Sequence, residues 1–168
     1  MSEISFTPFH VENIAVSVII AVIGTFGLVS NCIAILALRY NPALRNSFGL
    51  LCLSHSIAGM IVLLAFVFWA APTTLLESAL STELIGKVVG AVIVMFWNVY
   101  IYTHLAISLN RVIVITFPLR VTNLLTVKNT SLIALICCIM GFFHATPLFW
   151  TKSCYAFFDT MKWDVHVF

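Results

Sequence analysis

The sequence predicts an all-α membrane protein with four transmembrane helices. The chain has 168 residues, of which 62% are hydrophobic and only 8% are charged, whereas a soluble domain carries roughly 25% charged residues. Its Lys, Arg, Asp and Glu residues leave four long uncharged runs between them. These runs are apolar all round, unlike the strands of a membrane β-barrel, in which polar and apolar residues alternate.

Each uncharged run is longer than the roughly 20 residues that cross a hydrocarbon core of about 30 Å as an α-helix. The bounding charges are Glu12 and Arg39, Arg45 and Glu77, Lys87 and Arg111, and Lys128 and Lys152. We therefore expect helices at about residues 14–38, 48–71, 84–115 and 130–150.

The first run predicts a retained helix rather than a cleaved signal peptide. The residues before it include Glu3 and Glu12 but no Lys or Arg, and the run is too long for the apolar region of a signal peptide. The connections that follow are short. Asn41-Pro42 predicts a tight first loop, and Pro72 predicts the end of the second helix.

The charges of the connections predict the orientation, because Lys and Arg favour cytoplasmic loops. The first connection contains Arg39 and Arg45, and the third contains Arg120 and Lys128, whereas the second contains two Glu residues and a single Lys. The first and third connections are thus expected in the cytoplasm, and both ends of the chain outside the cell. Accordingly, the glycosylation sequence that begins at Asn129 should lie inside and stay unmodified.

Polar residues inside the runs are the candidates for function, because each needs a partner away from lipid. Asn31, His55 and His104 all fall roughly 10–12 Å from the cytoplasmic end by helical rise. We expect them, with Ser108, to form a hydrogen-bonded layer that joins the first three helices. His104, Ser108 and Arg111 follow at helical spacing, so they share a face that is expected to look into the bundle.

A second group of polar and aromatic residues lies in the outer half of the membrane runs. Trp97, Asn98 and Tyr102 belong to the third run, and His144 lies about 24 Å from the cytoplasmic end of the fourth. Together they predict an outward-facing pocket for a small molecule, because such sites are mostly apolar with a few polar groups. For both groups, a purely structural role in helix packing stays open as the alternative interpretation.

No catalytic, metal or cofactor site is expected. The sequence contains no phosphate-binding glycine loop, no HExxH, no CxxC and no GxSxG. His55 and His104 have no Cys or carboxylate at ligand spacing, which argues against metal binding. Four cysteines lie in the membrane runs, where they act as small apolar residues, and Cys154 is expected outside without a partner in this chain. Neither an enzyme nor a nucleic-acid-binding protein is predicted.

The segment "SLNRVIVITFPLR", residues 108–120, resembles the end of the third helix in rhodopsin-like G-protein-coupled receptors. That region has a polar residue, an arginine, a short Val/Ile/Thr-rich stretch and then a proline, here Asn110, Arg111 and Pro118. "GLVSN" at residues 27–31 resembles the asparagine motif of helix one, and "LRNSFGLLCLS" at residues 44–54 resembles the entry to helix two. The closest resemblance, in "NSFGLLCLS" and "IYTHLAISLNRVIVITFP", is to nematode serpentine chemoreceptors of class x.

This resemblance implies a fold and a function for nearly the whole chain, from about residue 14 to its end. The helices would be the first four of a seven-helix receptor bundle, residues 1–168 a partial and apparently truncated receptor domain, and residues 151–168 the start of the second extracellular loop. The implied partners are membrane lipid, a small external ligand and, for the full-length receptor, a heterotrimeric G protein at the plasma membrane. Asn110, Arg111 and Pro118 would contact the G protein.

Several positions depart from the rhodopsin-like pattern. Asn110 replaces the acidic residue that would pair with the arginine, and Ile57 or Ala58 stands where helix two has an aspartate. Gly86 replaces the cysteine of helix three, which leaves Cys154 without the usual bridge, and Cys137 replaces a tryptophan of helix four. The alternative interpretation is a four-helix membrane adaptor or transporter subunit, in which Arg111 is only a charge that anchors the helix end.

Overall fold

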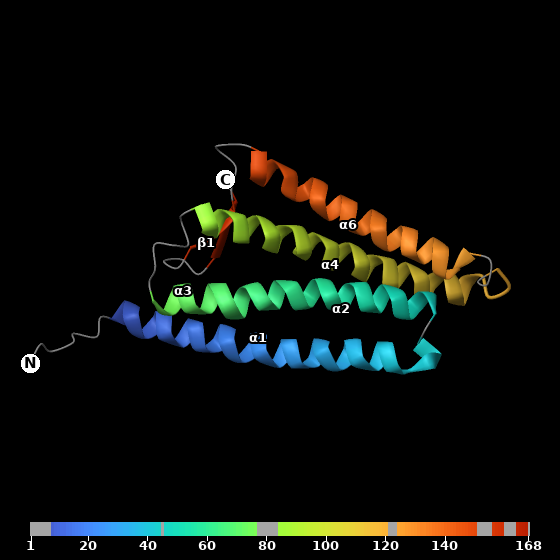
Figure 1. Ribbon diagram of the computed structural model, residues 1–168, viewed down its shortest axis with the longest axis horizontal. Helices are drawn as coiled ribbons and strands as arrows, with labels where there is room; N and C mark the ends of the chain where they lie inside the picture. The colour runs from blue at the N-terminus through green and yellow to red at the C-terminus, as the bar shows by residue number, and fades with distance from the viewer. Residues whose placement is uncertain are drawn as a thin grey trace, which may run out of the picture.

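A computed structural model describes residues 8–44, 46–76, 84–120, 124–150, 156–159 and 164–167. Its long helices run side by side in chain order across the molecule (Figure 1). They are α1 (Pro8–Tyr40), α2 (Ser47–Ala65), α4 (Leu84–Thr116) and α6 (Val127–Trp150). Shorter elements are η1 (Pro42–Leu44), η2 (Phe66–Ala70) and α3 (Ala71–Leu75).

The predicted all-α membrane architecture is confirmed. Within the described residues, four helical spans are long and apolar enough to cross a membrane: Val11–Tyr40, Ser47–Leu75, Leu84–Thr116 and Val127–Leu148. The expected bounds of the third helix agree with α4 to within one residue. The first helix begins earlier than expected, at Pro8, and proline is well suited to a first helical position because its φ angle is already helical.

The second span continues past Pro72, where the sequence predicted an end. Pro72 has no N–H to donate and would crowd the carbonyl one turn earlier, so a regular α-helix is disturbed there. The chain adapts by a π-helical turn, η2, after which the Ala71 N–H bonds to the Phe66 carbonyl five residues back. The wider turn admits the proline, and α3 carries the helix on to Leu75.

Side-chain caps fix where α2 and α6 begin. The Asn46 side chain accepts a hydrogen bond of 2.9 Å from the Gly49 N–H, and the Thr126 hydroxyl accepts one of 3.2 Å from the Asn129 N–H. Both caps satisfy a backbone donor that a helix start leaves unpaired. Ser47 also donates to the Leu125 carbonyl, which ties the beginning of α2 to the segment before α6.

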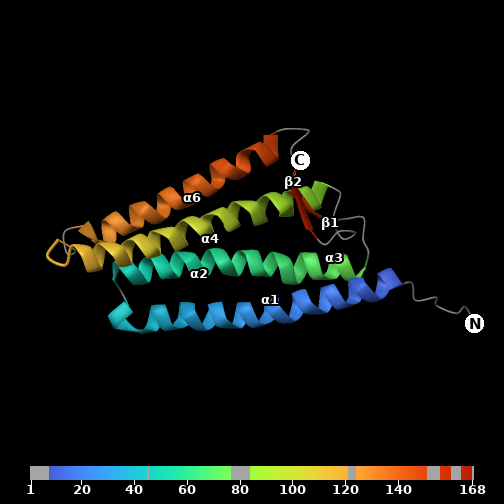
Figure 2. The same cartoon turned by 180° about the vertical axis from the view of Figure 1, so that it is seen from behind.

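Helix α2 is at the centre of the arrangement, because it packs against α1, α4 and α6. The view from behind shows the same order of helices (Figure 2). Small residues set the closest approaches. A Cβ on Gly24 would lie 2.4 Å from Val67 Cγ2, and one on Gly141 would lie 2.5 Å from Val99 Cγ2. Such close approach is typical of helix packing in membranes, where dispersion contacts replace the hydrophobic effect.

A short hairpin, which the sequence did not predict, follows the helices. Strand β1 (Ala156–Asp159) pairs antiparallel with β2 (Asp164–Val167), and Ala156 is opposite Val167. The hairpin lies near the beginning of α4 and contacts it through β1 (Figure 2). We call this end of the molecule the hairpin end.

Most cations of the described residues lie at the opposite end of the bundle, which we call the basic end, whereas Lys87 lies near the beginning of α4. Arg39 closes α1, Arg111 lies in the last turns of α4, and Arg120 and Lys128 flank the connection to α6. Four residues of the sequence predictions lie outside the described residues: Cys154, which was predicted to be exterior, and the charged residues Arg45, Glu77 and Glu83. The bundle therefore has one distinctly cationic end, which is the asymmetry that sets orientation in membranes.

Candidate functional site at the basic end

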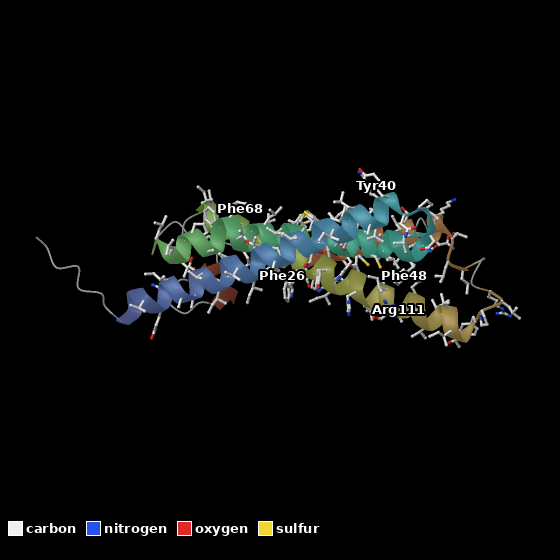
Figure 3. All side chains as sticks on the ribbon, turned by 90° about the horizontal axis from the view of Figure 1, so that it is seen from below. Phe26, Tyr40, Phe48, Phe68 and Arg111 are labelled. Carbon is white, nitrogen blue, oxygen red and sulfur yellow. The ribbon has the colours of Figure 1, made fainter. Side chains whose placement is uncertain are left out.

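Arg111 lies on the surface of α4 near the basic end, against an aromatic ring of α2. Its guanidinium carbon is 5.3 Å from the centroid of the Phe48 ring, and Figure 3 shows both side chains. A guanidinium over the face of a ring is attracted by the negative face of the π system. The side chain of Arg111 is exposed while it makes this contact, so its hydrogen-bond donors stay accessible.

Asn110 points elsewhere. Its side chain is only 4% exposed, and its carbonyl oxygen Oδ1 has no hydrogen-bond partner among the described residues. Adjacent residues of a helix are separated by about 100° around the axis, so Asn110 faces the bundle while Arg111 faces outward. The residue that replaces the usual acidic neighbour thus points away from the arginine, and Phe48 supplies the contact.

Pro118 belongs to the exposed turn that follows α4. The Phe117 N–H still bonds to the Ile113 carbonyl at 2.9 Å, and the Arg120 N–H bonds to the Phe117 carbonyl at 3.0 Å. Proline pre-sets the backbone of such a turn. Asn110, Arg111 and Pro118 therefore lie at one end of the molecule, but only Arg111 and Pro118 present exposed side chains there.

His55 is the residue of the predicted polar layer that connects two helices by hydrogen bonds within the described part of the chain. Its Nδ1 lies 3.2 Å from the Tyr100 carbonyl and 3.3 Å from Thr103 Oγ1, and its ring stacks on Tyr100 with centroids 4.0 Å apart. Because a carbonyl only accepts hydrogen bonds, Nδ1 carries the proton. His104 is brought near as a ring, with its centroid 5.5 Å from that of His55. The hydrogen bonds from α2 to α4 therefore pass through Tyr100 and Thr103 rather than His104.

The other members of that layer bond within their own helices. Asn31 Nδ2 donates to the Gly27 carbonyl at 2.9 Å, and Ser108 donates to the His104 carbonyl at 3.1 Å. His104, Ser108 and Arg111 do share a face of α4, but that face is exposed in the part of the chain that the structure describes. Asn31 is nonetheless close to α2, because its Oδ1 would be 3.7 Å from a Cβ on Gly59.

The four residues of the predicted ligand pocket fall into two places. Tyr102 on α4 meets His144 on α6, with the hydroxyl 3.3 Å from both ring nitrogens. His144 Nδ1 is also 3.0 Å from the Met140 carbonyl, to which it can only donate. His144 lies in the half of α6 nearer the hairpin end, and Tyr102 lies near the middle of α4.

Trp97 is on another side of α4. Its indole stacks with Tyr100 at a centroid distance of 6.2 Å, and together they border a cavity against α1 and α2 that also includes Asn31. Asn98 shares the Tyr102 side of the helix and donates to the Val94 carbonyl at 2.8 Å. The structure thus places Trp97 at the same cavity as Asn31 of the polar layer, and not beside Tyr102 or His144.

Sequence reasoning missed Phe48 and Gly59 of α2 and Thr103 of α4, which take part in these contacts. Phe48, Cys52, His55 and Gly59 follow one another at helical spacing, and this period was the available signal for a shared face. Phe48 and Gly59 carry no charge or hydrogen-bonding side chain, so a search for polar groups passes over both. Among the described residues there is also no group of three metal-ligating side chains.

Comparison with known proteins agrees with this geometry. Residues 21–167 match the family described as "Serpentine type 7TM GPCR chemoreceptor Srx". Serpentine receptor class X 45 of Caenorhabditis elegans is 28% identical over 158 residues, which are 92% of this chain and 42% of that protein. The Allatostatin-A receptor of Bombyx mori is 29% identical over 119 residues, which are 68% of this chain and 32% of that receptor.

Each of these two relatives is more than twice as long as the part that this chain matches. The family match, in contrast, covers most of the chain, including all of α2, α4 and α6, and it includes both Phe48 and Arg111. The chain therefore belongs to the Srx family of serpentine seven-transmembrane G-protein-coupled chemoreceptors.

Proposed function

We propose that this chain acts in a G-protein-coupled chemoreceptor for a small external molecule, at the plasma membrane. Family membership and four membrane-spanning helices support this proposal. Receptor activity as a whole is proposed for a protein of the length that its relatives have, because the chain spans less than half of either one.

The proposed orientation has the N-terminus outside and the basic end in the cytoplasm. Arg39, Arg111, Arg120 and Lys128 all lie at the basic end, and Lys and Arg are retained preferentially on the cytoplasmic side. The hairpin end, with β1 and β2, would then face the exterior. Asn129, at the basic end, already donates its side-chain amide to the Leu124 carbonyl at 3.0 Å, which agrees with a sequon that is not used.

One observation carries the proposed contact with a G protein: the exposed Arg111 guanidinium at the basic end, held beside Phe48. An arginine in this position presents up to five N–H donors to a partner that enters from the cytoplasm. Pro118 shapes the exposed turn that follows. Asn110 contributes from within the bundle, because its buried and unpaired Oδ1 favours any rearrangement of α4 that provides a donor.

Ligand recognition is proposed for the outer part of α4 and for α6. Trp97, Asn98, Tyr102 and His144 supply aromatic surface and a few hydrogen-bonding groups, which is the usual composition of a small-molecule site. A ligand there would act by binding one receptor conformation better than the other. The polar layer of Asn31, His55, His104 and Ser108 lies between these residues and the basic end.

The experiment that tests the proposal compares Arg111→Ala with Arg39→Ala in a receptor of the relatives' length. Each variant removes one cation from the basic end, but Arg39 closes α1 and not α4. We expect Arg111→Ala to abolish ligand-evoked signalling in cells while surface expression is kept, and Arg39→Ala to signal normally.

Two outcomes would contradict this role of Arg111. Normal signalling by Arg111→Ala would show that the arginine is not a coupling residue. An equal loss of surface expression in both variants would favour the interpretation in which Arg111 only anchors a helix end, as in a membrane adaptor.

A further inference from the structure

A partly open cavity of about 200 Å³ lies between α1, α2 and α4, and residues of all three helices line it. The lining residues are Asn31, Gly59, Val62, Leu63, Trp97 and Tyr100. We call it the Asn31–Trp97 cavity. It is separate from the Tyr102–His144 contact, which lies between α4 and α6.

Gly59 creates room at this place. A Cβ on Gly59 would lie 3.1 Å from Tyr100 Cε2 and 3.7 Å from Asn31 Oδ1. The first distance is tighter than ordinary van der Waals contact, so any larger residue would push on the Tyr100 ring. That ring also stacks on the His55 ring, 4.0 Å away between centroids, so a packed aromatic ring bounds the cavity.

The polar groups of the cavity define what it can recognise. Asn31 uses its NH₂ group to bond to the Gly27 carbonyl, which leaves Oδ1, on the side of Gly59, as an acceptor. Val62 and Leu63 are apolar, and Trp97 and Tyr100 offer ring faces. No Lys, Arg, Asp or Glu is among the lining residues, so an ion would enter without a counter-charge, which is costly.

The volume sets the size of the occupant. An apolar cavity of about 150 Å³ accepts benzene, which has six non-hydrogen atoms. A cavity of about 200 Å³ thus has room for about eight non-hydrogen atoms on the same scale. An aromatic ring with one short polar substituent satisfies the volume, the ring faces and the Asn31 acceptor together.

We propose that the Asn31–Trp97 cavity binds a small uncharged aromatic molecule that donates one hydrogen bond to Asn31 Oδ1. A signalling role for this binding rests on the receptor function proposed above. In that role the ligand would push on Tyr100 and, through it, on His55 of the polar layer.

Binding is tested on the full chain in lipid nanodiscs by ¹⁹F NMR with three probes. 4-Fluorobenzyl alcohol has the ring and one donor, fluorobenzene lacks the donor, and 4-fluorobenzoate carries a charge. We expect saturable binding of the alcohol, binding of fluorobenzene that is about 2- to 10-fold weaker because one hydrogen bond is lost, and no saturable binding of the benzoate. Empty nanodiscs measure the partition into lipid.

Two variants test whether the probe binds in this cavity. Gly59→Ala should weaken binding of the alcohol by about tenfold, because the added methyl group competes for space beside Tyr100. Asn31→Leu should reduce the alcohol to the affinity of fluorobenzene, and it keeps the test valid where Gly59→Ala does not fold. Thr146→Val is the matched control, because Thr146 also bonds only to a carbonyl of its own helix, that of Phe142 at 2.9 Å, away from the cavity.

Absence of saturable binding, or equal binding by the unaltered chain and both cavity variants, would overturn the proposal, as would stronger binding of the benzoate than of the alcohol. The measurement contains no G protein. A negative result therefore leaves the coupling role of Arg111 intact, and a failure of the Arg111 experiment leaves the cavity proposal intact.

Discussion

At the scale of single residues, Arg111 and Phe48 are the pair on which coupling is expected to depend. In the rhodopsin-like pattern an acidic neighbour restrains the arginine, but here Asn110 is buried and turned away. The Phe48 ring, 5.3 Å from the guanidinium carbon, is the contact that remains. The donors of the guanidinium stay exposed, but an arginine that leaves the ring to engage a partner loses the cation–π contact, so we take the Phe48 contact as the resting form.

The first prediction at this scale concerns Phe48. Phe48→Leu should raise ligand-independent signalling by about 2- to 5-fold, because an exposed cation–π contact contributes about 0.5–1 kcal/mol. Phe48→Tyr keeps the ring and should behave like the unaltered receptor. G-protein nucleotide exchange without ligand, normalised to surface expression, measures both. Equal exchange in the Leu and Tyr variants would show that the ring does not restrain Arg111.

Arg111 and Pro118 could be located from the sequence because their spacing is a local property of one helix and the turn after it. Phe48 could not, since its role depends on how α2 is rotated against α4. The same limit applies to Trp97, which was grouped with Tyr102 by depth alone. Depth follows from helical rise, but the side of the helix that meets a neighbour is decided by packing, here with Asn31 and Gly59.

At the scale of elements, the four spans follow from the positions of the charges, and the structure changes mainly their ends. Helix α6 begins at Val127 because Thr126 caps it, and the second span passes Pro72 because a π turn absorbs the proline. Turns of this kind occur often at functional sites, but they depend on tertiary contacts. Here the Ser17 hydroxyl of α1 donates to the Ala71 carbonyl at 2.7 Å, directly after the π turn.

The close approach of α4 and α6 gives a prediction about stability. In Gly141→Ala the new Cβ would lie 2.5 Å from Val99 Cγ2 and 3.0 Å from the Met95 carbonyl oxygen, whereas in Gly27→Ala it meets only the side chain of Leu63, at 2.9 Å. Because a backbone carbonyl cannot move as easily as a leucine tip, we expect Gly141→Ala to cost about 1–3 kcal/mol of folding free energy and Gly27→Ala to cost less.

Unfolding of the purified chain in detergent micelles, followed by circular dichroism, measures both glycine variants. The test compares the loss of folding free energy in the two variants, since both add one methyl group to a membrane helix. If Gly27→Ala lowered the stability as much as Gly141→Ala, the contact with the α4 backbone would not be what limits the approach of these two helices.

At the scale of the whole molecule, the bundle is apolar on its outer faces and cationic at one end. Large side chains such as Phe26 on α1 and Phe143 on α6 are exposed, as Phe26 is in Figure 3. Such faces are compatible with lipid. Most described cations lie at the basic end and the hairpin lies at the other end, so the two ends of the molecule differ. The roles proposed for Arg111 and for the ligand-binding residues depend on which of these ends faces the cytoplasm.

The orientation is tested most directly by thiol labelling of two exposed turns in intact cells. Cys154, which is expected outside, is first replaced by Ser. Leu76→Cys then marks the hairpin end and Leu119→Cys the basic end, at side chains that are 73% and 94% exposed. We predict that a membrane-impermeant maleimide labels Leu76→Cys on intact cells and labels Leu119→Cys only after permeabilisation. Labelling of Leu119→Cys on intact cells, with Leu76→Cys protected, would place the basic end outside and contradict the contact of Arg111 with a G protein.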